Sequence, residues 1–106
     1  MIVLPPEPSR ELSIDIDLAK RIRARDLRAY RVLIDRYYPF IYDVAFALHQ
    51  DDDIANQYVM DVFSHAWNCA EGIRSEGSLR PYFFRLIFAK YQRYLSLFPR
   101  PSIVVG

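Results

Sequence analysis

The clearest indication of the fold class comes from the stretch at residues 26–50, DLRAYRVLIDRYYPFIYDVAFALHQ. Apolar side chains recur in it every three or four residues, which is the spacing of one helix face rather than of a strand. Asp26 can cap a helix, and Pro39 falls on the side away from the apolar stripe. The stretch therefore predicts a long amphipathic helix with an outward kink at Pro39 rather than a stop. Its predicted core face is Tyr30, Leu33, Ile34, Tyr37, Ile41, Val44 and Leu48.

A shorter helix is predicted before this stretch, over about residues 15–24. Asp15 and Asp17 are suited to its first turn, because carboxylates favour the positive end of a helix dipole. Residues 1–14 are rich in proline, which lacks a backbone donor and fixes the chain in extended or turn forms. They are expected to form a flexible tail.

Two more helices are predicted after it. The third runs from about Asp53 to Ala70, and the fourth, capped by Ser78, runs to about Phe98. With no strand pattern, the expected fold is an all-α bundle of about four helices over residues 15–97, followed by the start of an interdomain linker at 98–106. The predicted core face of the third helix is Ala55, Tyr58, Val59, Val62, Phe63, Ala66 and Ala70.

Composition agrees with one small globular domain. The chain has 106 residues, of which 52% are hydrophobic and 25% charged. Its apolar runs are shorter than the roughly 20 residues that cross a membrane, so no membrane partner is expected. The one cysteine, Cys69, cannot form an internal disulfide, which agrees with a reducing compartment. A soluble cytoplasmic protein is therefore expected.

Charge is distributed unevenly along the chain. Residues 43–70 carry five acidic and no basic side chains, whereas residues 71–106 carry six basic and two acidic ones. A basic end beside an acidic middle can engage a polyanion with one surface and a basic protein with another. Three solvated helix faces would give the same pattern, so charge alone leaves both interpretations open.

The fourth predicted helix separates an aromatic face from a cationic one. Cations beside an aromatic side chain favour single-stranded nucleic acid, which needs charges for its phosphates and a ring for base stacking. A solvated helix side with a partly buried tyrosine is the alternative. The predicted core face is Phe84, Ile87, Phe88, Tyr91, Tyr94, Leu95 and Phe98. The cationic face is Tyr82, Arg85, Ala89 and Arg93, with Leu86 and Lys90 at its edge and Arg74 and Arg80 just before it.

Catalytic and metal-binding patterns are weak. His65 and Cys69 are four residues apart on one helix face and could hold a metal, with His49 as a possible third ligand. Two ligands do not make a site, and a buried cysteine with a solvated histidine is the favoured interpretation of the pair. With no phosphate-binding loop or triad motif, we expect no enzyme activity, no metal and no cofactor.

Three blocks of the chain together resemble region 2 of the bacterial sigma-70 family, in its extracytoplasmic-function (ECF) group. They are RARDLRAYRVLIDRYYPFIY, DVFSHAW and GSLRPYFFRL, in register over roughly residues 15–97. Arg25 stands where the family often has glycine, a residue that favours positive φ. The resemblance implies a helical domain that binds the clamp helices of the RNA polymerase core and opens the minus-ten element of a promoter.

The same resemblance implies two sets of functional residues. The loop at residues 72–79 would receive a base flipped from the non-template strand, and the fourth helix would flank that strand. The DNA-binding set is Arg74, Ser78, Arg80, Tyr82, Arg85, Ala89, Lys90 and Arg93. The polymerase-binding set is Gln57, Met60, Asp61, Ser64 and Trp67, of which Met60 and Trp67 are expected to be partly exposed beside the core face.

Two alternatives stay open within this resemblance. One is a sigma-like module that binds an anti-sigma factor without engaging DNA. The other concerns length: region 4, which contacts the minus-thirty-five element, has no counterpart in residues 1–106, so a fragment of a longer factor or a protein with region 2 alone is expected.

Overall fold

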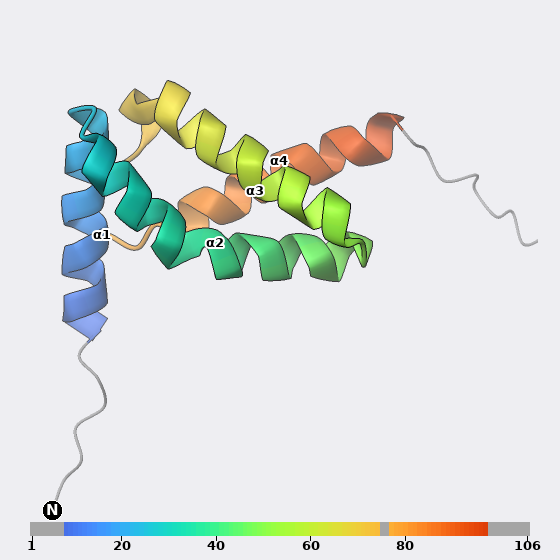
Figure 1. The fold of residues 1–106 in the computed structure, drawn as a ribbon, viewed down its shortest axis with the longest axis horizontal. Coiled ribbons are helices and arrows are strands. Elements are labelled where there is room, and N and C mark those ends of the chain that lie inside the picture. The colour runs from blue at the N-terminus through green and yellow to red at the C-terminus, as the bar shows by residue number, and fades with distance from the viewer. Residues whose placement is uncertain (1–7, 75–76, 98–106) are drawn as a thin grey trace, which may run out of the picture.

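The structure, a computed structural model, describes residues 8–74 and 77–97. Within these residues the fold is all-α, with four α-helices, one short 3₁₀ helix and no strand (Figure 1). This confirms the fold class predicted from the periodicity. The elements are α1 (Pro8–Arg23), α2 (Leu27–His49), α3 (Asp52–Asn68), the 3₁₀ helix η1 (Ala70–Gly72) and α4 (Arg80–Leu97).

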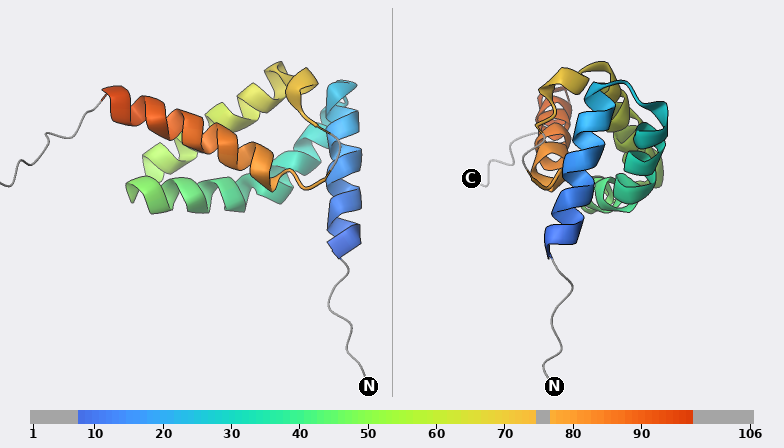
Figure 2. Two further views of the ribbon diagram at one scale, coloured as in Figure 1. Left: turned by 180° about the vertical axis from the view of Figure 1, so that it is seen from behind. Right: turned by 90° about the vertical axis from the view of Figure 1, so that its left-hand side faces the viewer.

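The helices form a compact bundle around one connected core. α2 and α3 form an antiparallel pair, and α4 packs across both of them (Figure 1). α1 lies across the end of this group at the start of α4, as the two other views show (Figure 2). The bundle therefore places the beginning of α4 against α1 and α2, and the rest of α4 against α2 and α3.

α1 differs from the helix predicted before residue 26. It begins at Pro8, because proline is tolerated at a first helical position where no N–H partner is needed. Residues 8–14 of the expected tail are thus helical, whereas residues 1–7 and the expected linker at 98–106 lie outside the described residues. Asp15 is consequently not in a first turn: it lies in mid-helix and is buried.

α2 confirms the expected cap and the expected proline. The Asp26 carboxylate accepts hydrogen bonds from the backbone N–H groups of Arg28 (2.9 Å) and Ala29 (3.3 Å). The helix continues through Pro39, which is exposed, and Figure 1 shows α2 bending part-way along its length. In the preceding turn Arg25 has φ 61°, the left-handed conformation that favours glycine.

The core face of α3 was predicted correctly, whereas that of α4 was predicted correctly at Ile87 but not at Phe84 or Phe88, and Phe98 lies outside the described residues. All the predicted α3 side chains are buried, including Ala70 in η1. On α4 the buried residues are Phe83 and Ile87, while Phe84 and Phe88 are 41% and 40% exposed. Apolar residues cover more than half of this helix, so periodicity alone allows several faces, and packing against α2 and α3 selects one of them.

Candidate functional site

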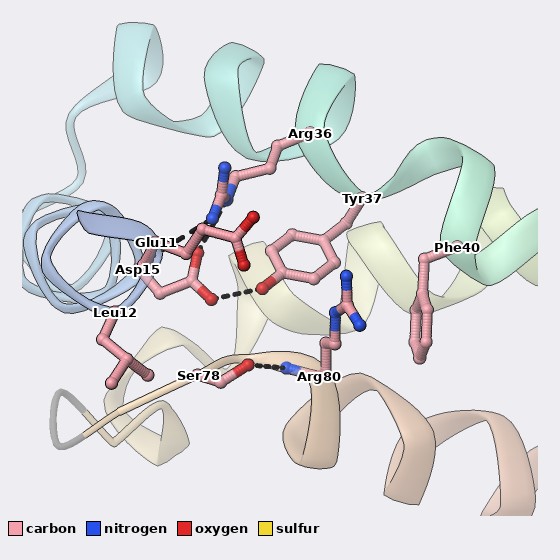
Figure 3. Close-up of a pocket in the computed structure, with 8 residues that line it drawn as sticks. All are labelled: Glu11, Leu12, Asp15, Arg36, Tyr37, Phe40, Ser78 and Arg80. Atoms are coloured by element: carbon pink, nitrogen blue, oxygen red, sulfur yellow. Dashed lines mark hydrogen bonds and ion pairs between the residues drawn. The ribbon is translucent and has the colours of Figure 1, made fainter. Parts of the chain in front are cut away.

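Two hollows border α4, and they contain six of the thirteen residues predicted to bind DNA or polymerase. The first, here called the Arg80 pocket, has a volume of about 360 Å³ (Figure 3). The second, here called the α3–α4 groove, has a volume of about 240 Å³. The Arg80 pocket is lined by Glu11, Leu12, Asp15, Arg36, Tyr37, Phe40, Ser78 and Arg80. The α3–α4 groove is lined by Asp61, Val62, His65, Leu86, Ala89, Lys90 and Arg93.

The Arg80 pocket is built around the buried carboxylate of Asp15. Oδ1 accepts a hydrogen bond from Nε of Arg36 at 2.8 Å, and Oδ2 accepts from the Tyr37 hydroxyl and from the backbone N–H of Leu79 at 2.9 Å. One side chain of α1 thus joins α2 to the residue just before α4. Burial, followed by the hydrogen bond to Asp15, raises the pKa of Tyr37 to about 12, so the hydroxyl remains a donor at neutral pH.

Arg80 and Ser78 form the α4 side of the pocket. Figure 3 shows the Arg80 side chain reaching from the start of α4 toward α2, beside the Phe40 ring. Its guanidinium carbon lies 5.8 Å from the centre of that ring, within cation–π range. The Ser78 hydroxyl accepts from the backbone N–H of Arg80 at 3.2 Å, but Leu79 stands at the N-cap position, so Ser78 supports the first turn from one residue before the predicted cap position. The pocket therefore offers a cation, a hydroxyl and an aromatic face together.

The loop before α4 is anchored at both ends. Ile73 and Leu79 are buried, and the bond from Leu79 to Asp15 ties the second anchor to α1. Residues 75–76, within the segment expected to receive a base, lie outside the described residues. The described part of the loop thus lies between the core and the Arg80 pocket.

The arginines on the exposed side of α4 have no ion-pair partner in the described part of the chain. Arg85 and Arg93, together with Arg74 before the helix, are exposed and form no ion pair within residues 8–74 and 77–97. On the same helix Phe84 and Phe88 form an exposed edge-to-face pair with ring centroids 4.6 Å apart. Exposed cations and exposed aromatic rings therefore both occur on α4, with the rings coming from the face that was predicted to be core.

Tyr82 was predicted on this exposed side, but it is half-buried. Its ring packs edge-to-face against Phe83 at 5.2 Å, and its hydroxyl is buried without a hydrogen-bond partner among the described residues. Burial raises its pKa to about 12. The same rotation of α4 that exposes Phe84 turns Tyr82 toward the core.

The α3–α4 groove brings the two predicted functional sets together. Nζ of Lys90, from the DNA-binding set, forms an ion pair with Oδ2 of Asp61, from the polymerase-binding set. Ala89 and Arg93 line the same groove, and Nε2 of Gln57 donates to the other Asp61 oxygen at 3.3 Å. No pattern in the sequence indicated this contact, because it joins residues far apart on the chain.

The remaining polymerase-binding candidates differ in exposure. Met60 is 66% exposed and Ser64 is exposed, whereas Trp67 is half-buried, as expected for a side chain beside the core face. The Trp67 ring lies 4.8 Å from that of Tyr30 and 5.3 Å from the guanidinium of Arg25, which also donates to the Trp67 carbonyl. Trp67 therefore ties α3 to the turn before α2.

The histidines and the cysteine considered as metal ligands lie in three separate environments. Nε2 of His49 lies 2.6 Å from the Tyr58 hydroxyl, and its ring contacts those of Tyr91 and Tyr94. His65 is exposed in the α3–α4 groove, and Cys69 is half-buried after α3. Among the described residues no group of three or more His, Cys, Asp or Glu side chains could hold a metal ion.

Sequence reasoning named Ser78 and Arg80 but missed the roles of Asp15, Arg36 and Phe40 in the Arg80 pocket. Asp15 precedes Leu18 and Ala19 by three and four residues, so it shares their buried helix face. That spacing was a usable signal. Nothing in the pattern pointed to Arg36 and Phe40, because their partners Asp15 and Arg80 come from other helices.

Comparisons with known proteins gave no match to a family model, a curated protein or a solved structure. Within the described residues, no helix combines the length and the apolarity that crossing a membrane requires.

Proposed function

We propose that the chain is a sigma region 2 domain of the ECF type, which binds the RNA polymerase core and holds the non-template strand of the minus-ten element unpaired. The observation that carries this proposal is the arrangement along α4. Arg85 and Arg93 are exposed without ion pairs in the described part of the chain, and the helix begins at a pocket that holds Arg80 beside Phe40.

The chemistry of this surface suits an unpaired strand. Free guanidinium groups form charge-assisted hydrogen bonds with phosphates, and their attraction does not depend on sequence. A base extruded from its stack can lie against an aromatic ring, and the Arg80 pocket falls within the roughly 300–1,000 Å³ range of small-molecule sites. Unstacking a base costs a few kcal/mol, which such contacts can offset. Binding free energy would then open the strands, and the polymerase would perform the chemistry.

The second surface of the proposal is the outward side of α3. Gln57, Met60 and Ser64 are exposed there, and Asp61 lies at its edge beside the α3–α4 groove. An exposed thioether among polar groups is suited to a protein contact, because methionine adapts to irregular surfaces. We assign this face to the clamp helices of the polymerase. The contact is tested by co-purification with the polymerase core, in which Met60→Asp should reduce recovery.

Binding to a fluorescent minus-ten single strand tests the DNA surface. Replacing Arg85 and Arg93 with alanine should weaken binding at least tenfold and reduce the salt slope by about 1.4, since each lost phosphate contact contributes about 0.7 on a single strand. The matched control is Arg28→Ala with Arg31→Ala, two exposed α2 arginines whose loss changes the net charge equally. The proposal fails if the native protein does not bind the strand, or if the control pair loses as much affinity.

One observation favours a second candidate function, a sigma-like module that binds an anti-sigma factor without engaging DNA. The exposed Phe84 and Phe88 pair is apolar surface of the kind found at protein interfaces. This candidate predicts no strand binding by the native protein, and loss of anti-sigma binding in Phe88→Ser. The strand assay and an anti-sigma pulldown on the same preparation separate the two functions.

A further inference from the structure

The α3–α4 groove contains a cluster of charges whose pairing is incomplete. Lys90 and Arg93 contribute two cations from α4, and Asp61 contributes one carboxylate from α3. Only Lys90 is paired with that carboxylate, while Arg93 has no ion pair within the described residues. The groove is therefore cationic overall, and it opens beside the exposed arginines of α4.

Lys90 is held in the groove by two contacts. One is the ion pair with Asp61, and the other places Nζ 5.1 Å from the centre of the Tyr58 ring. The side chains of Lys90 and Asp61 keep 30% and 43% of their exposure, so water reaches both partners. Solvated ion pairs of this kind contribute little to stability, and a lysine amine on its flexible stem can change partners.

A phosphate can replace the carboxylate at this position. It is an anion with several acceptor oxygens, and it could bind Lys90 and Arg93 at once, whereas among the described cations Asp61 engages Lys90 alone. The Asp61 carboxylate weakens phosphate binding in two ways. It is already paired with the Lys90 amine, and its negative charge repels the phosphate. Removing the charge of Asp61 should therefore favour phosphate binding.

We propose that the α3–α4 groove binds a backbone phosphate of a single nucleic-acid strand through Lys90 and Arg93, and that Asp61 competes with this phosphate for Lys90. The inference rests on the proposed function, because it names the strand as the ligand. A cationic partner that neutralises Asp61 from the α3 side would then strengthen strand binding on α4. By linkage, a bound strand would strengthen that partner's contact with Asp61 by the same factor.

The test measures strand binding by fluorescence anisotropy with Asp61→Asn, which keeps the shape of the side chain and removes its charge. At about 0.15 M salt we expect about fivefold tighter binding, the lower end of typical coupling between sites. Lys90→Gln should bind more weakly than the native protein. In the double variant, Asp61→Asn with Lys90→Gln, strand binding should be no tighter than in Lys90→Gln alone, because the lysine amine that Asp61→Asn would release is absent.

The matched control is Asp53→Asn, which changes the net charge equally on the same helix. Asp53 lies two turns before Asp61, about 12 Å along the axis, which exceeds the screening length of about 8 Å at this salt. It should change affinity less than twofold. An equal gain in Asp53→Asn, or a gain in Asp61→Asn that survives Lys90→Gln, overturns the inference.

Two further measurements in the same binding assay identify the ligand. An abasic strand should show the same gain in Asp61→Asn, because the groove contacts phosphate rather than a base. Inorganic phosphate at millimolar concentration should not displace the strand; displacement would assign the groove to the free anion and overturn the inference. If the native strand affinity depends on Arg85 but is unchanged in Asp61→Asn, the inference fails while the proposed function stands. If neither protein binds the strand, both fail.

Discussion

Asp15 and Asp61 each join two helices through a carboxylate, yet their surroundings are opposite. The Asp15 side chain is 2% exposed and accepts from Arg36, from Tyr37 and from the backbone of Leu79. The Asp61 side chain is 43% exposed, and its partners, Lys90 and Gln57, are long flexible side chains. The first carboxylate is buried and accepts from a backbone N–H and a tyrosine hydroxyl as well as from an arginine, whereas the second is partly exposed and accepts only from two long side chains among the described residues.

This difference separates a carboxylate that positions the fold from one that can exchange partners. A buried carboxylate that loses its donors is left with an uncompensated charge, so its network is difficult to open. An exposed carboxylate exchanges a side-chain donor for water at little net cost. The start of α4 is therefore fixed by Asp15, while the groove beside its middle can be remodelled by a ligand.

The largest expected effect comes from breaking the first network. Asp15→Ala leaves the Arg36 charge and the donors of Tyr37 and Leu79 unpaired, so it should lower the free energy of unfolding by about 3–5 kcal/mol. Urea denaturation measures the loss, and hydrogen exchange at the Leu79 amide should accelerate. Asp17→Ala is the control, because that exposed side chain has only a weak ion pair with Arg21 at 3.4 Å. Similar losses in both variants would contradict the special role of Asp15.

An intermediate effect is expected at the C-terminal end of α2, where His49 packs against Tyr91 and Tyr94 of α4. Titration of His49 should make the stability of this contact depend on pH. Burial, with a smaller contribution from Lys90, lowers the pKa of His49 below its ordinary value of 6.5. The unfolded chain therefore binds the proton first as pH falls, so stability present above pH 6.5 is lost progressively below it.

Thermal unfolding between pH 8 and pH 5.5 measures this dependence. His49→Gln should reduce the slope, because glutamine does not titrate and can still hydrogen-bond to Tyr58. A slope that is the same in the native protein and in His49→Gln would assign the dependence to other groups.

The smallest expected effect completes the comparison. Asp61→Asn should change the free energy of unfolding by less than about 1 kcal/mol, since solvated ion pairs contribute about that amount or less. Urea denaturation of this variant beside Asp15→Ala gives both values under the same conditions. A loss of several kcal/mol in Asp61→Asn would mean that this pair also supports the fold, and the distinction between the two carboxylates would disappear.

Local pattern was sufficient for much of the fold. The α3 core face, the Asp26 cap and the passage of α2 through Pro39 follow from spacing and residue type, and the structure confirms them. The prediction was wrong where the pattern was ambiguous. Phe83 is buried and Phe84 exposed, because neighbouring apolar residues satisfy more than one helical stripe.

The candidate site was less accessible to sequence reasoning than the fold. The cations of α4 could be named from their spacing, and Arg85 and Arg93 are exposed as expected. The Asp15 network and the pair of Asp61 with Lys90 were not predicted, because each joins residues from different helices. Their sequence separation leaves no periodic signal.

The helices of this protein, most of their ends and the charge of each segment follow from the order of the residues, since these depend on neighbours within one or two turns. The folded chain alone shows which side of α4 faces the core, which aspartate is buried and which is paired with a lysine. Those outcomes depend on how helices pack against one another, and packing free energy is a property of contacts between segments that no single segment contains.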